Sequence, residues 1–220
     1  MNALNTKVVV GLGAAGVFGA VGGGAWYVSR PKNVRSKLIS EGLTLVGSSH
    51  RAWRSVFLTH SGDNEFMSFS GVGSGNSDKE AASKVMSACE KVMKVSVDSK
   101  DYTSSLNKAR RYCTTPNFKT IETKVLFSDR EIASEERDWK NLFTAHKEDG
   151  AFIEKVKKAN LDATITKDSS SDDAKEKVKK FCNDLKVQPP NSAGIADYEK
   201  YCLQTPLIQR FSTKILAVDL

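Results

Sequence analysis

Hydrophobic residues recur at helical spacing in two matching stripes along the chain. Each stripe has members at positions i, i+3, i+4 and i+7: Trp53, Val56, Phe57 and His60 form the first, and Trp139, Leu142, Phe143 and His146 form the second. Side chains at this spacing share one face of an α-helix. Both stripes therefore predict amphipathic helices, and they are the first indication of a mainly α-helical fold.

Two further pairs of predicted helices carry a cysteine on the apolar face. The apolar positions of the first pair are Ala82, Val85, Met86, Cys89, Val92 and Met93, and then Ala174, Val178, Phe181, Cys182 and Leu185. Those of the second pair are Tyr102, Leu106, Ala109 and Cys113, and then Ile195, Tyr198 and Cys202. Short apolar runs at 124–127 and 214–218 fit either small strands or helix ends, and the pattern leaves this choice open.

Polar residues mark where two of these helices begin. Ser77 and Glu80 have the spacing of a capping box, in which each side chain bonds to the other's backbone N–H. Ser134 precedes the second tryptophan stripe and is followed by Glu135 and Glu136, which suit the positive end of a helix dipole. We expect Ser77 and Ser134 to be N-caps.

The order of rare residue types repeats along the chain, which indicates an internal duplication. The tryptophan, phenylalanine and histidine of the first stripe return at an offset of 86 residues. Later matches are Cys89 with Cys182, Tyr112-Cys113 with Tyr201-Cys202, Thr115-Pro116 with Thr205-Pro206, Thr123-Lys124-Val125-Leu126 with Thr213-Lys214-Ile215-Leu216, and Asp129 with Asp219. These matches predict two small helical modules, at 47–131 and 132–220. Residues 34–38, ahead of the apolar run at 43–46, faintly resemble the end of each module, and this segment could begin the first module just as 123–129 leads into the second.

The N-terminal segment has the composition of a membrane anchor. Residues 8–29 form a run of 22 without a charged side chain. A helix of that length spans about 33 Å, close to the ~30 Å hydrocarbon core of a bilayer. Trp26 and Tyr27 stand just before the basic flank that starts at Arg30, where amphipathic rings favour the membrane interface. We predict a transmembrane signal-anchor at 1–30 that contacts lipid through 8–29, followed by a juxtamembrane segment at 31–46.

Small residues follow one face of this predicted anchor. Gly11, Ala15, Gly19 and Gly23 are four residues apart, a spacing that lets two membrane helices approach closely. They are the candidate residues for helix packing and self-association in the bilayer.

Two other interpretations of the N-terminal segment stay open. Residues 11–16 match the glycine-rich GxGxxG of dinucleotide-binding proteins. However, the segment after it has no polar face, and the first acidic residue of the chain is Glu41, too late for the usual ribose contact. We therefore favour the membrane anchor over the nucleotide site. Cleavage as a signal peptide after Ala25 is the second alternative.

The four cysteines form two pairs at similar spacing. Cys89 with Cys113, and Cys182 with Cys202, are candidate disulfides, each closing a loop of roughly 20 residues worth about 3 kcal/mol. The alternative is four buried thiols that behave as small hydrophobic side chains. The oxidation state depends on the compartment, so the sequence does not decide between them.

Composition and charge add little specific chemistry. The 220 residues include 33 lysines and arginines against 26 acidic residues, a formal charge of +7, with both signs interspersed. Mixed charge of this kind is typical of solvated helix faces, which argues against a nucleic-acid partner. We find no catalytic motif and no CxxC or paired-histidine zinc spacing, so we predict no catalytic residues, no metal and no cofactor. His60 and His146 are expected to be half-buried and hydrogen-bonded.

The chain resembles a group of uncharacterised paralogous proteins of haemotropic mycoplasmas. The likeness covers nearly the whole chain: the Gly/Ala/Val-rich start at 8–28, the segment Ser36-Lys37-Leu38 with Glu41-Gly42-Leu43-Thr44-Leu45, the helices of Trp53 and Trp139, and the Tyr-Cys pairs followed by Thr-Pro. The resemblance implies a membrane-anchored protein made in many variant copies, with a suspected role at the cell surface. It assigns no functional residues.

Together these features predict a single-pass membrane protein, not an enzyme, whose soluble region is an extracellular interaction or antigenic module. Host or membrane proteins are the expected partners. The basic flank after residue 29 favours the opposite orientation, which would make the protein a cytoplasm-facing scaffold. An enzyme that uses 11–16 as a nucleotide site is the remaining alternative.

Overall fold

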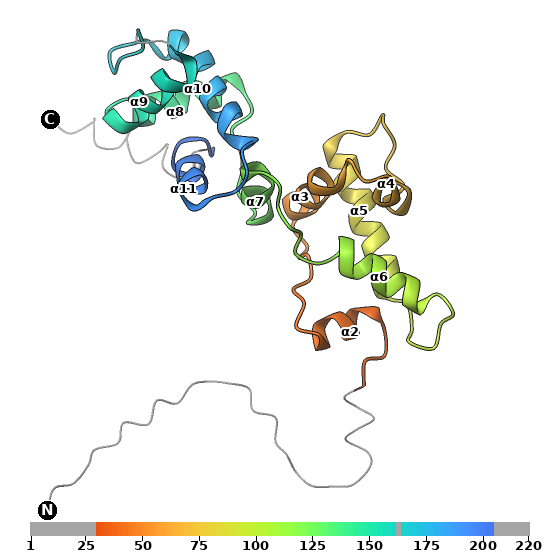
Figure 1. Cartoon of the computed structure of the whole chain (residues 1–220). Coiled ribbons are helices and arrows are strands. Elements are labelled where there is room, and N and C mark those ends of the chain that lie inside the picture. Colours follow the sequence, from red (N-terminus) through yellow and green to blue (C-terminus); the bar gives the residue numbers. More distant parts are fainter. Residues whose placement is uncertain (1–29, 162–163, 205–220) are drawn as a thin grey trace, which may run out of the picture. The chain divides into compact units, whose positions relative to one another are not determined.

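Helices account for nearly all regular structure in the described part of the chain. The computed structural model describes residues 30–161 and 164–204 (Figure 1). Its helices are α2 (Val34–Ser40), α3 (His50–His60), α4 (Asn64–Ser70), α5 (Asp78–Met93), α6 (Tyr102–Tyr112), α7 (Ile121–Phe127), α8 (Glu136–His146), α9 (Gly150–Asn160), α10 (Ser171–Lys186) and α11 (Ser192–Tyr201). All of them belong to one compact unit that begins at Pro31. The expectation of a mainly helical fold is confirmed.

The helices form two series of five with the same order. The first module comprises α2–α6 and the second module comprises α7–α11. Helices α3 and α8 each have 11 residues, and α5 and α10 each have 16. An isolated β-bridge closes each series, Leu45 with Thr114 in the first and Ile132 with Leu203 in the second.

Each module has its own hydrophobic core. The first core runs from Val34 on α2 to Cys113, just after α6, and the second runs from Ile121 on α7 to Cys202, just after α11. The predicted division at 131/132 therefore lies after α7, whose Ile121 and Val125 belong to the second core. Likewise α2, within the predicted juxtamembrane segment 31–46, supplies Val34 and Leu38 to the first core.

The apolar run at 124–127 forms the end of helix α7 rather than a strand. The Thr120 hydroxyl accepts a hydrogen bond from the Thr123 backbone N–H, and the Thr123 hydroxyl accepts one from the Thr120 backbone N–H. This capping box starts the helix. Asn33 and Ser36 form the same box at the start of α2. The counterpart run at 214–218 lies outside the described residues.

The predicted helix starts are correct at one position and wrong at another. Ser77 caps α5 and forms the expected box with Glu80. The N-cap of helix α8 is Glu135 and not Ser134. The Asp138 carboxylate accepts hydrogen bonds from the backbone N–H groups of Ser134 and Glu135. A carboxylate within the first turn has replaced the serine hydroxyl as the capping group.

Helix α7 links the two modules by packing along α3 as well as into its own core. The buried Ser55 hydroxyl of α3 donates to the backbone oxygen of Thr123 on α7 at 2.6 Å. Beyond the end of α7, the Asp129 carboxylate accepts from Arg51 at 3.1 Å. One short helix thus serves as the first element of its module and as the cover of the preceding one.

Within residues 30–161 and 164–204, no helix is long and apolar enough to cross a bilayer. The predicted anchor at 8–29 and its candidate packing residues Gly11, Ala15, Gly19 and Gly23 lie outside the described residues, as does the glycine-rich run at 11–16.

Candidate functional site

A disulfide lies in each core, between the long helix and the last helix of the module. Cys89 on α5 joins Cys113, and Cys182 on α10 joins Cys202, with Cα–Cα separations of 5.6 Å in both. All four cysteines are buried. These are the two candidate pairs of the sequence analysis, which left the choice between disulfides and buried thiols open.

An aromatic cluster packs beside each disulfide. In the first module the rings of His60, Phe66 and Tyr112 lie with centroids 5.2–5.3 Å apart. In the second module His146, Phe152 and Tyr201 repeat the arrangement at 5.2–5.6 Å. The tyrosine precedes the second cysteine of its pair, so the ring cluster and the disulfide hold the same helix end.

One aspartate completes each cluster. Asp63 is the N-cap of α4, and its Oδ2 accepts from the Tyr112 hydroxyl at 3.1 Å and pairs with Arg111 at 2.8 Å. The sequence analysis did not single out this residue. Its signal was present, because an aspartate stands three residues after the repeated histidine in both modules.

The second module reproduces this arrangement with a different cation. Asp149 caps α9, and its Oδ2 accepts from the Tyr201 hydroxyl at 2.9 Å and from Lys200 Nζ at 2.8 Å. The hydrogen bond from Lys200, then that from Tyr201, lowers the pKa of Asp149. The carboxylate, the hydroxyl and the ammonium satisfy one another, so the cluster fixes the start of one helix to the end of another.

The two histidines are less polar than the sequence suggests. Both rings are partly buried, as predicted, and burial lowers the pKa of each, with nearby lysines adding to the effect. His60 Nε2 has no hydrogen-bond partner within the described residues, so the expected hydrogen bond is not seen at this nitrogen. The ring acts as a neutral aromatic member of the cluster.

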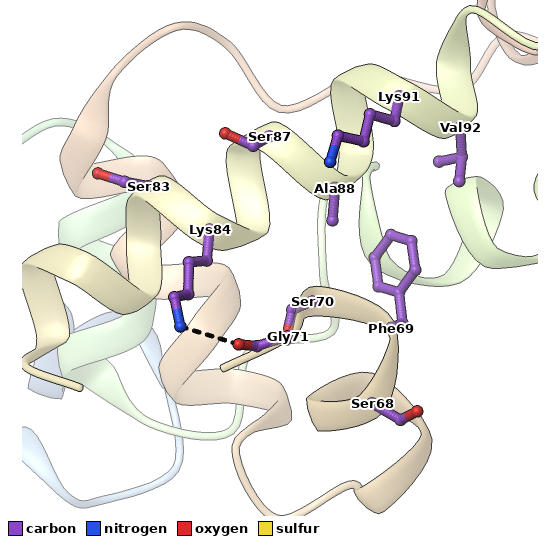
Figure 2. Close-up of a pocket in the computed structure, with 10 residues that line it drawn as sticks. All are labelled: Ser68, Phe69, Ser70, Gly71, Ser83, Lys84, Ser87, Ala88, Lys91 and Val92. Carbon is purple, nitrogen blue, oxygen red and sulfur yellow. Dashed lines mark hydrogen bonds between the residues drawn. The ribbon is translucent and has the colours of Figure 1, made fainter. Parts of the chain in front are cut away.

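A groove of about 520 Å³ with a mixed polar and apolar lining lies between α4 and α5 in the first module (Figure 2). Lys84 and Lys91 extend from α5 over it, and Phe69 and Val92 lie at one end. Lys84 Nζ donates to the backbone oxygen of Gly71 at 3.0 Å and to Asn76 Oδ1 at 2.9 Å. Four serines are among the lining residues: Ser68, Ser70, Ser83 and Ser87.

The second module differs at the positions that form this groove. When Cys89 is aligned with Cys182, Ser87 corresponds to Lys180 and Lys91 to Asp184. Lys180 and Asp184 pair with each other along α10. Two positions that line the groove therefore differ between the modules, whereas the ring clusters and disulfides occur in both.

A smaller hollow lies beside the tryptophan of each module, with a volume of about 380 Å³ at Trp53 and about 310 Å³ at Trp139. Trp53 is 2% exposed and its Nε1 has no partner among the described residues. Arg35 and Glu90 line the first hollow, and Glu122 and Asn183 stand at the corresponding places in the second. The two hollows therefore lie at equivalent places in the two modules, but the residues that line them differ in charge.

The described residues contain no cluster of histidine, cysteine, aspartate or glutamate that could hold a metal ion. Fold and side-chain arrangement define the class as a mainly helical protein with two disulfide-containing modules. In comparisons with protein-family models, curated proteins and solved structures, nothing matched this chain.

Proposed function

We propose that the chain is a single-pass membrane-anchored protein whose two modules act as an extracellular interaction surface. The observation that carries the proposal is the contrast between interior and surface. The cysteines and most of the aromatic residues that repeat between the modules are buried, among them Tyr112, Tyr201 and both disulfides. The residues that differ lie outside, as at the α4–α5 groove. A scaffold that keeps its core while its surface varies is suited to contact with partners rather than to one fixed chemistry.

The disulfides support placement outside the cytoplasm. Disulfides persist in oxidising compartments and are rare where thiols are kept reduced. Both pairs are buried, each in a core of its own. The uncharged run at 8–29 would supply the link to the bilayer, and host or membrane proteins would be the partners.

The groove of the first module is the face we propose for contact. Lys84 bonds to neutral oxygens, and it and Lys91 give the groove a positive charge. An acidic surface segment of a partner protein would complement this charge and speed the encounter. Phe69 and Val92 would add apolar contact at one end of the groove.

The anchor is tested by comparing the full chain with one that starts at Pro31. We expect the full chain to sediment with membranes and to be released by detergent alone, whereas the shorter chain stays in the aqueous phase. A full chain that is soluble without detergent would contradict the anchor and would favour the nucleotide-site alternative at 11–16.

The compartment is tested by counting thiols in protein taken directly from its own cells. Alkylation without reductant should modify none of the four cysteines, and alkylation after reduction should modify all four. Four reactive thiols before reduction would contradict the extracellular placement and favour the cytoplasm-facing scaffold.

A further inference from the structure

The face of α3 that α7 covers has a counterpart on α8 that the described helices leave open. Ser55 and Thr59 on α3 are 0% and 2% exposed. At the offset of 86 that joins the two tryptophans, they correspond to Asn141, which is partly exposed, and Ala145, which is exposed. Helices α3 and α8 have the same length, and Trp53 and Val56 are buried like their counterparts Trp139 and Leu142.

The contact between α7 and α3 shows what such a face binds. Leu126 of α7 is 1% exposed, and the backbone of Thr123 accepts the buried Ser55 hydrogen bond. Asp129 follows the helix with φ of 60° and accepts from Ser49 Oγ at 2.6 Å and from Arg51 at 3.1 Å. An apolar residue and, three positions later, an aspartate are therefore the recognised features.

Both features recur once more at the C-terminus. Residues 205–220 repeat 115–130 at a constant offset of 90, so Thr123, Leu126 and Asp129 correspond to Thr213, Leu216 and Asp219. On the other side of the contact, Arg137 of α8 stands where α3 has Arg51 and is exposed. Leu216 thus corresponds to the apolar partner of the helix face and Asp219 to the carboxylate partner of the arginine. The place of Ser49, which also donates to Asp129, is taken by Glu135, whose carboxylate lies 3.7 Å from Arg137.

We propose that the open face of α8, formed by Arg137, Asn141 and Ala145, binds the chain's own segment 213–219 as α3 binds 123–129. Leu216 would lie over Ala145 and Asn141, and Asp219 would pair with Arg137. The second module would then be covered by a linking segment in the same way as the first.

Helix α2 of a second copy is the rival occupant. Its Ile39 is the counterpart of Leu126 and is 57% exposed, so it also presents an apolar side chain. At the place of Asp129, however, this helix has Gly42, which offers Arg137 no carboxylate. The chain's own segment has the charge and, because only residues 205–212 separate it from Gln204, a high effective concentration.

The proposal is tested by lysine-specific proteolysis of the full chain in detergent micelles. Mass spectrometry follows release of the peptide 215–220, which requires cleavage after Lys214. Docking protects this bond, because cleavage needs local release of the segment. Leu216→Asp or Ala145→Arg should each speed release by about tenfold or more, since either change places a charge in the apolar contact.

Matched variants control for the substitutions themselves. Leu220→Asp makes the same change within the released peptide, at a position whose counterpart Arg130 is exposed. Ala151→Arg makes the same change at an exposed position of α9. Both should leave the rate as in the wild type. Equal release rates from all five proteins would overturn the proposal, and protection that disappears on dilution would overturn it in favour of a second copy.

Discussion

At the scale of single residues, the repeated aspartates explain how each module holds its last helix in place. Asp63 and Asp149 cap one helix and accept the tyrosine hydroxyl from another. The tyrosines, histidines and cysteines of these clusters could be predicted because they repeat in order on apolar stripes. The aspartates were missed because hydrophobic periodicity carries no signal for polar residues, and only their repeated place three residues after each histidine could have indicated them.

The buried histidines make stability depend on pH. Burial lowers the pKa of His60 and His146 in the folded protein, so folding favours the neutral ring. Their contribution is fully present above the ordinary pKa of about 6.5 and is lost as the pH falls through the lower folded-state value. Denaturant unfolding should therefore show that the free energy of unfolding decreases from pH 7.5 to pH 5.

Histidine variants test whether the two buried rings cause this pH dependence. The double variant His60→Gln/His146→Gln should make the free energy of unfolding less dependent on pH. The control His50→Gln, outside both clusters, should show the same pH dependence as the wild type. A wild-type stability that does not change over this range would contradict the assignment.

Ser55 should matter more than its size suggests. Ser55→Ala removes the buried hydrogen bond from the Ser55 hydroxyl to the Thr123 backbone oxygen, which should cost about 0.5–1.5 kcal/mol of unfolding free energy. Ser61→Ala, at the exposed end of the same helix, should change stability by less than ~0.5 kcal/mol. Equal values for the two variants, measured by denaturant unfolding, would show that the contact between α3 and α7 contributes nothing.

At the scale of elements, the helices followed from apolar spacing, but their ends depended on local chemistry. The capping box of Ser77 and Glu80 could be predicted because it uses a serine hydroxyl at the usual spacing. The start of α8 was misplaced because Asp138, inside the helix, supplies the capping carboxylate. Helix α7 was left undecided because seven residues are too few for periodicity to separate a helix from a strand.

The end of α4 gives a prediction about backbone conformation. Gly71 ends this helix with φ of 66°, a left-handed conformation that costs other residues about 1 kcal/mol. Gly71→Ala should lower the unfolding free energy by roughly that amount. Gly75→Ala is the control, because its Cβ would meet open space and its φ is not positive. If thermal unfolding showed no difference between the two, the left-handed helix end would be incorrect.

At the scale of the whole molecule, the internal repeat predicted two modules and their cysteine pairs, but not the double role of α7. Sequence matches align residues with their counterparts and do not tell which core a boundary helix enters. Ile121 and Val125 enter the second core while Ser55 of the first module bonds to Thr123 between them. The linking helix is therefore shared, and the modules are coupled through it.

Removing one disulfide should destabilise its module strongly. The double variant Cys182→Ala/Cys202→Ala removes the disulfide between two residues 20 apart in sequence. It should lower the free energy of unfolding by about 3 kcal/mol, because the unfolded chain gains conformational entropy. The pair Cys89→Ala with Cys113→Ala, 24 apart, should cost a similar amount. Calorimetry of the oxidised proteins measures both. A loss below ~1 kcal/mol in each would mean that the cystines contribute little to the fold.

The most direct test of the account is the position of the modules relative to the bilayer. Intact cells that carry the full chain are treated with a protease that cannot cross membranes, and an antibody against the second module follows its loss. A cytoplasmic protein serves as the control for cell integrity. The account predicts that the modules are degraded on intact cells while the control survives. Modules that stay whole until the cells are lysed would contradict it.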